Sequence, residues 1–96
     1  MLRVPHMNWS NELAYYVTPK SGPMRPMETL LDANRALLDD LSPAIRRRPH
    51  WVAVKRLLLA AATSAEPVDI RLATDGLVRA LEAEGWMTRS KMAECG

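Results

Sequence analysis

The segment IRRRPHWVAVKR, residues 45 to 56, concentrates positive charge within twelve positions. Guanidinium groups bind phosphate oxygens through charge-assisted hydrogen bonds, and each phosphate contact adds affinity that salt weakens. These cations are the candidate contacts for an anion or a nucleic acid: Arg46, Arg47, Arg48, Lys55 and Arg56. The competing interpretation, which we favour, is a solvated loop and helix face, because short basic runs are weak signals and the apolar stripe of the predicted helix points the other way.

The side chains that usually carry catalysis or bind metals are scattered. His6 lies in a predicted tail, His50 begins a predicted helix, and Cys95 is the penultimate residue. Asp39 and Asp40 are adjacent, so they point apart on a helix and do not form an acid–base pair. We therefore predict no catalytic residue, no metal site, no cofactor and no enzymatic activity. The alternative, a hydrolase or transferase, would need a concave pocket that holds titratable groups with shifted pKa values.

Three aromatic residues near the N-terminus form a candidate interface. Trp9 precedes a predicted strand, and Tyr15 and Tyr16 are neighbours within it, so one tyrosine should face away from the core. An exposed aromatic side chain beside an open strand edge is a plausible docking surface for a protein. In the alternative, both tyrosines cover the helices from a bent strand, and the sequence does not decide between the two.

The composition is typical of one globular domain. The chain has 96 residues, of which 48% are hydrophobic and 25% are charged, and its formal net charge is +2. A chain of this size supports a single core. The longest apolar run, LLLAAA at 57 to 62, is shorter than the roughly 20 residues that span a bilayer. Because the N-terminus has no secretory pattern and the single cysteine suits a reducing compartment, we expect a cytoplasmic protein with no membrane segment.

The first elements predict a weak β-hairpin. Alternation in ELAYYVT, 12 to 18, together with its aromatic and β-branched residues, predicts a strand. PKSG, 19 to 22, predicts a turn. PMRPM, 23 to 27, would then return beside the first strand. Because its two prolines lack an N–H donor, we expect either a short edge strand or no strand at all.

Apolar residues at three- and four-residue steps predict three helices after the hairpin. Their starts are marked by a Thr29 and Asp32 cap, by Pro49 and by Pro67. We expect Pro43 to end the first helix and Gly85 to end the last. The stripes predicted to face the core are Leu30, Leu31, Asn34, Leu37, Leu38 and Leu41; Trp51, Val54, Leu57, Leu58, Ala61 and Ala62; and Ile70, Ala73, Leu77, Ala80, Leu81 and Glu84. Gly76, inside the last helix, predicts a close helix contact or a local irregularity.

The predicted fold is therefore α+β and mostly helical, with a short N-terminal β-hairpin packed on three α-helices. The alternative is an all-α three-helix domain. We place the domain at residues 12 to 87, between a flexible tail at 1 to 11 and a frayed C-terminal tail at 88 to 96.

The order of these segments resembles a known family. A strand, the turn PKSGPMRPM, and the segments TLLDANRALLDDL, HWVAVKRLLLAA and RLATDGLVRALEAEGWM are similar to a family of small alphaproteobacterial proteins, domain-of-unknown-function family nine-eight-two. The resemblance covers about residues 12 to 87 and departs from the family pattern at the end of the first helix, where SPAI replaces a Trp-Pro pair. It implies no activity and no functional residues.

A second, local resemblance concerns LVRALEAEGWMTR, residues 77 to 89. This segment resembles the end of a recognition helix and the entry to the wing in winged-helix regulators such as the MarR family. Such domains need another helix between the LLLAAA segment and the recognition helix, where only residues 63 to 76 are available. Glu82 and Glu84 also lie where phosphates would bind.

These patterns lead to two hypotheses about function. The favoured one is a non-enzymatic interaction module that forms a homodimer or binds an unknown protein partner, through the hairpin edge or the apolar helix faces. The alternative is a winged-helix-like nucleic-acid-binding protein that uses the cluster from Arg46 to Arg48. We expect neither a membrane nor a metal among its partners.

Overall fold

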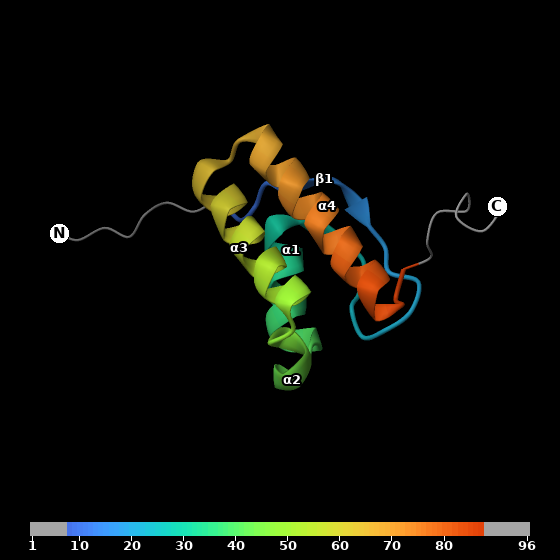
Figure 1. The fold of residues 1–96 in the computed structure, drawn as a ribbon. Helices are drawn as coiled ribbons and strands as arrows, with labels where there is room; N and C mark the ends of the chain where they lie inside the picture. The colour runs from blue at the N-terminus through green and yellow to red at the C-terminus, as the bar shows by residue number, and fades with distance from the viewer. Residues whose placement is uncertain (1–7, 88–96) are drawn as a thin grey trace, which may run out of the picture.

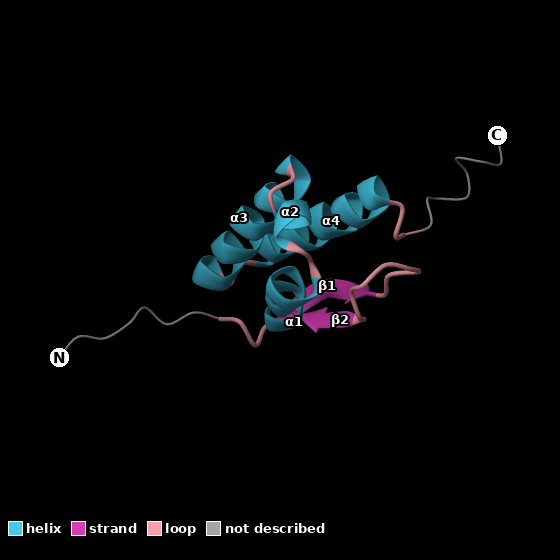
Figure 2. Cartoon of the chain, turned by 90° about the horizontal axis from the view of Figure 1, so that it is seen from below, coloured by secondary structure: helices cyan, strands magenta, loops and turns pink. Residues whose placement is uncertain are grey.

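A short antiparallel hairpin and a set of helices make up residues 8 to 87, the part of the chain that the computed structural model describes (Figure 1). The elements in chain order are β1 (Glu12–Val17), β2 (Met27–Thr29), α1 (Leu30–Arg35), the π-helical turn η1 (Ala36–Asp40), α2 (Pro43–Arg46), α3 (Pro49–Ser64) and α4 (Pro67–Glu84). The predicted α+β, mostly helical architecture is confirmed. Figure 2 shows the hairpin beside α1 and facing the α3–α4 pair.

The hairpin is shorter on its return side than the sequence predicts. β1 and β2 pair antiparallel, with Glu12 opposite Thr29 and Val17 opposite Met27, and the register shifts between these two pairs. The predicted return strand at 23 to 27 is wrong except for its last residue. Its prolines cannot donate to a strand ladder, so they lie in the loop, and β2 has only three residues.

β1 packs along α4 through one face. Leu13 and Val17 are buried, whereas Tyr16 is 59% exposed, as alternation along a strand requires. The amide of Ala14 donates to the hydroxyl of Thr74, which is fully buried on α4, at 3.0 Å. This bond ties β1 to a helix that lies 60 residues further along the chain.

The first helix begins where the sequence predicts. The Thr29 hydroxyl accepts from the Asp32 amide at 3.0 Å, and the Asp32 carboxylate accepts from the Glu28 amide at 2.9 Å and the Thr29 amide at 3.2 Å. This capping box satisfies amides that a helix start would otherwise leave unpaired. After α1 the helix widens into η1, which no sequence pattern indicated, and the chain becomes extended at Leu41.

Pro43 does more than the predicted ending of a helix, because it also starts α2. The Ser42 hydroxyl caps α2 by accepting from the Ile45 amide at 3.4 Å. A proline in a first helical turn sacrifices no hydrogen bond. The basic run therefore begins on a short helix, where a loop was predicted.

α3 and α4 form a helical hairpin joined by only two residues, Ala65 and Glu66 (Figure 1). Both helices begin at the predicted prolines, and Gly85 closes α4 with a left-handed φ of 81°. A Cβ atom built on Gly76 would lie 2.7 Å from Cδ1 of Leu57. The predicted close helix contact at Gly76 is thus confirmed.

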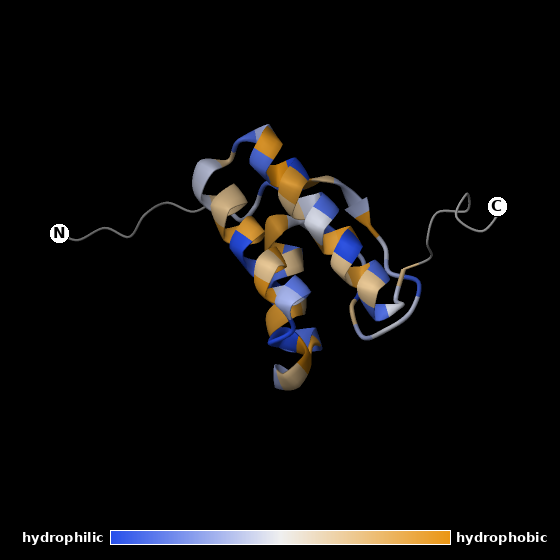
Figure 3. Cartoon of the chain, viewed as in Figure 1, coloured by the Kyte–Doolittle hydropathy of each residue, from blue (hydrophilic) through white to orange (hydrophobic). Residues whose placement is uncertain are grey.

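The core lies where α1, α3, α4 and β1 meet. Leu37, Leu58 and Leu77 are exposed by no more than 3%, and Trp51 by 1%. Each such side chain contributes about 1.5 to 3 kcal/mol when it leaves water. Figure 3 shows hydrophobic and hydrophilic positions alternating around α3 and α4, as the three- and four-residue steps predict.

The predicted N-terminal tail is partly docked. Asn8 donates through its backbone amide to the Ala62 carbonyl at 2.8 Å and through its side chain to the same oxygen at 3.0 Å. The Trp9 carbonyl accepts from the Leu31 amide at 2.9 Å. Residues 8 to 11 therefore contribute to the folded unit, while the predicted C-terminal tail at 88 to 96 lies outside the described residues.

Within residues 8 to 87, no helix combines the length and the apolar character that a membrane-spanning helix needs.

Candidate functional site

The basic run borders a hollow of about 390 Å³ between the first helix and α3. We call this hollow the α1–α3 groove. Its lining residues come from the four consecutive helical segments α1, η1, α2 and α3 and their junctions: Asn34, Leu37, Leu38, Pro43, Arg46, Arg47, Trp51, Val52 and Lys55. The lining contains three cations and no carboxylate. The groove therefore combines an apolar floor with a positive rim.

The floor exposes large aliphatic side chains. Leu38 is 45% exposed and Val52 is 39% exposed, beside the buried Leu37 and Trp51. Leu31 and Leu59, each two helical turns away from one of these residues along its helix, are 40% and 50% exposed. Scattered exposed leucines are normal on a protein surface, but a concave site that groups them with cations is characteristic of binding sites.

The structure divides the predicted cationic cluster. Arg46, Arg47 and Lys55 line the groove, and Arg46 donates to the Leu38 carbonyl at 3.3 Å. Arg48 instead donates to Glu84 on α4 at 2.5 Å. Arg56 is exposed and does not line the groove. Three of the five predicted cations thus share one surface.

Glu84 is the residue whose role the sequence concealed. Its side chain is only 6% exposed, and its carboxylate accepts from Arg48, from the indole of Trp51 at 2.9 Å, and lies 2.8 Å from Nε2 of His50. Burial by itself raises the pKa of Glu84, but the hydrogen bonds from His50, Trp51 and Arg48 outweigh burial and hold the pKa below its ordinary value. Glu84 therefore stays ionised and fixes the start of α3 against the end of α4.

This network has two consequences for the groove. Because the indole of Trp51 is held by Glu84, the buried ring that backs the groove has a defined orientation. Because Arg48 is paired, its charge is not available to an external anion to the same degree as that of Arg47 or Lys55. The sequence placed Glu84 on the buried stripe of the last helix, and a carboxylate at such a position was the signal that a cationic partner had to exist.

The predicted aromatic interface is also divided by the structure. The Tyr15 hydroxyl donates to Asp75 at 2.5 Å, and the Arg71 guanidinium lies 5.8 Å from the centre of its ring. Burial, followed by the bond to Asp75, raises the pKa of Tyr15 to about 12. Trp9 is partly buried against the core. Tyr16 is left as the most exposed of these three aromatic residues.

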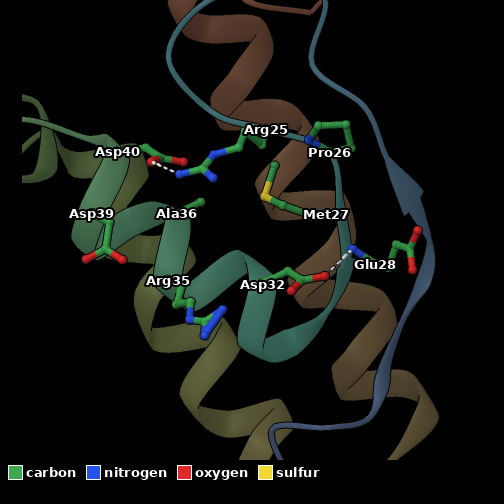
Figure 4. A pocket seen from close by; sticks show the side chains of 9 residues that line it. All are labelled: Arg25, Pro26, Met27, Glu28, Asp32, Arg35, Ala36, Asp39 and Asp40. Carbon is green, nitrogen blue, oxygen red and sulfur yellow. Dashed lines mark hydrogen bonds and ion pairs between the residues drawn. The ribbon is translucent and has the colours of Figure 1, made fainter.

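A second hollow, of about 470 Å³, lies on the other side of α1 and η1 (Figure 4). We call it the hairpin hollow. It is lined by Arg25, Pro26, Met27, Glu28, Asp32, Arg35, Ala36, Asp39 and Asp40. Figure 4 shows Asp40 directed toward Arg25, which it meets at 3.7 Å, and Asp32 directed toward the Glu28 amide, whereas Asp39 points away.

Asp32, one of the acids of the hairpin hollow, is hydrogen-bonded to the backbone at the start of α1. The hydrogen bond from the Glu28 amide is the main cause that lowers the pKa of Asp32, with the Thr29 amide and hydroxyl adding to it against the effect of burial. Asp39 and Asp40 point in different directions. Among residues 8 to 87, no group of three or more His, Cys, Asp or Glu side chains is placed to hold a metal ion.

Comparison with known proteins adds no relative: no protein family, no curated protein and no solved structure matches this chain. The resemblance of residues 12 to 87 to family nine-eight-two therefore stays a prediction. What the protein does must follow from its own residues.

Proposed function

We propose that this protein is a non-enzymatic interaction module that binds another polypeptide, either a partner protein or a second copy, through the α1–α3 groove. The observation that supports this proposal is the grouping of exposed Leu38 and Val52 with Arg46, Arg47 and Lys55 around one concave surface. Apolar residues with a polar rim are the usual anatomy of a protein interface. We further propose that the protein works in the cytoplasm.

The hairpin edges are less suited to this role than the groove. On β1, the Ala14 amide is already bonded to Thr74, and at β2 the amides of Glu28 and Thr29 are bonded to Asp32. Strand addition requires free backbone donors and acceptors along an edge. Because these amides are occupied, the interaction is better assigned to the helix surface.

The nucleic-acid alternative is favoured by one observation, the shared rim of Arg46, Arg47 and Lys55. Two others count against it. Arg48 is paired with Glu84, and the exposed aliphatic floor between the cations offers nothing to a phosphate. Duplex binding through this rim would weaken steeply between low and moderate salt, and a titration with DNA and RNA at two salt concentrations measures it.

A photo-crosslinking amino acid at position 52 tests the interaction module. In cells of the source organism, we expect a discrete adduct whose second polypeptide is identified by mass spectrometry. The matched control carries the same group at position 56, which is on the same helix but does not line the groove. Adducts that are equally frequent at positions 52 and 56, or missing from both, would count against the proposal.

A further inference from the structure

The lining of the α1–α3 groove gathers three cations and no carboxylate. Arg25, Arg48 and Arg71 each meet a carboxylate of the same chain. Among the described residues, Arg47 and Lys55 form no ion pair, and Arg46 has only the carbonyl of Leu38 within hydrogen-bonding distance. The groove therefore retains positive charge that the folded domain does not neutralise.

This charge lies beside an exposed aliphatic surface. Val52 is one helical turn from Lys55 on α3, and Leu38 accepts the Arg46 hydrogen bond through its own carbonyl. A ligand that covers Leu38 and Val52 must bring apolar groups to the floor and acceptors to the rim at the same time. A segment that is apolar along one stripe and acidic along its margins meets both requirements.

We propose that the α1–α3 groove binds an acidic amphipathic helix of a partner protein. The apolar stripe of that helix would cover Leu38 and Val52, and its carboxylates would pair with Arg46, Arg47 and Lys55. This inference rests on the interaction function proposed above and specifies the chemistry of the partner. A helix suits the site because the groove is formed between helices, which accept a third helix by packing side-chain ridges into grooves.

Charge argues against the occupants that this chain itself could supply. Residues 1 to 7 and 88 to 96 contain Arg3, Arg89 and Lys91 but only one acid, Glu94. A second copy that presented its own groove would bring the same cations, Arg46, Arg47 and Lys55, to the rim. Each of these would bring a cation toward a rim that is already positive, and like charges close together oppose binding.

The inference is tested with three synthetic helical peptides of about 18 residues, a length at which an isolated helix can form. All carry the same leucine stripe, and their remaining positions are glutamate, lysine or glutamine. Fluorescence anisotropy measures their affinity for the full-length chain. We expect the glutamate peptide to bind about tenfold or more tightly than the lysine peptide, a preference that added salt reduces.

Two adjacent substitutions on α3 give a matched pair for the same measurement. Lys55→Glu reverses a charge on the groove, whereas Arg56→Glu makes the same change in charge at a neighbour that does not line it. We expect K55E to lower the affinity for the glutamate peptide about tenfold and to raise the affinity for the lysine peptide. R56E should change either affinity by about twofold or less. Circular dichroism checks that both variants keep their helices.

Several outcomes would overturn the inference without removing the interaction function. Equal affinity for the three peptides, or equal effects of K55E and R56E, would show that acidic charge is not what the groove selects. Self-association that Val52→Glu abolishes would identify a second copy as the occupant. If crosslinks at position 52 are also missing, both the proposed interaction function and the proposed acidic helix are wrong.

Discussion

The hairpin hollow and the α1–α3 groove lie on opposite sides of α1 and η1, and they use charge differently. In the hairpin hollow, acids and cations line the same surface, and two of the acids have partners within the chain, Asp32 in backbone amides and Asp40 in Arg25. In the groove, cations border exposed aliphatic residues without an acid in the lining. We infer that the paired charges of the hairpin hollow stabilise the fold, whereas the cations of the α1–α3 groove can bind a partner.

The largest effect is expected from removing Glu84, which binds the indole of Trp51, a buried residue of the groove lining. Glu84→Ala would leave Arg48, His50 and the indole of Trp51 without their shared acceptor. We expect it to lower the free energy of unfolding by about 2 kcal/mol, since a buried partner is lost but Arg48 keeps access to water. Urea denaturation measures the loss, with Glu82→Ala as the control on the same helix.

The effect of Glu84 should also depend on pH. The pKa of Glu84 in the fold lies below its ordinary value of 4.5, so its stabilising effect is complete above that pH. The effect disappears as the pH falls through the folded pKa. Wild type and E84A should therefore converge in stability in acid, and an E84A deficit that persists unchanged there would contradict this account.

Replacing Asp32 tests whether the charges of the hairpin hollow stabilise the fold. Asp32→Ala removes an acceptor for the amides of Glu28 and Thr29 and half of the capping box. We expect a loss of about 1 kcal/mol in the free energy of unfolding, typical for a helix cap. Asp39→Ala, at an exposed acid of the same hollow, is the matched control and should change stability far less.

Tyr15 is expected to have a smaller effect on stability, which appears at high pH. Because its folded pKa is raised to about 12 from an ordinary 10, its stabilising contribution is present below pH 10 and is lost as the pH rises toward 12. Asp75→Asn removes the charge that accepts from the phenol, so it should lower the pKa of Tyr15. Absorbance titration of the phenolate measures this shift, and the Tyr16→Phe background removes the second tyrosine from the curve.

The smallest effect on stability is expected in the groove itself. Lys55→Ala and Arg47→Ala should change the free energy of unfolding by less than about 0.5 kcal/mol, as is usual for exposed residues, because neither forms an ion pair within residues 8 to 87. Urea denaturation, as for Glu84→Ala and Asp32→Ala, measures both variants. A loss as large as that of D32A would mean that these cations belong to the fold, and the contrast between the two hollows would disappear.

Local chemistry explains which parts of the fold could be predicted. The Thr29 and Asp32 cap, the helix starts at Pro49 and Pro67, and the end at Gly85 each depend on residues within one turn of each other. The return strand and η1 were missed because they depend on what packs against them. Prolines left the return strand three residues long, and no residue pattern distinguishes a π-helical turn from the α-helix that it continues.

The candidate site shows the same limit. The basic run is visible in the sequence, but its division was not predictable, because the partner of Arg48 lies 36 residues away on α4. Likewise, Tyr15 meets Asp75 across 60 residues. Which cations a fold neutralises and which it leaves exposed is decided by tertiary contacts, and the sequence names only the candidates.

The two-residue connection between α3 and α4 has a consequence for the order of folding. Closing so short a loop costs little chain entropy, so these helices can associate while the rest of the chain is still unfolded. β1 must instead reach α4 from 60 positions upstream. Since contacts of long sequence separation form slowly, we expect the helical pair to serve as the nucleus and the N-terminal strand to join last.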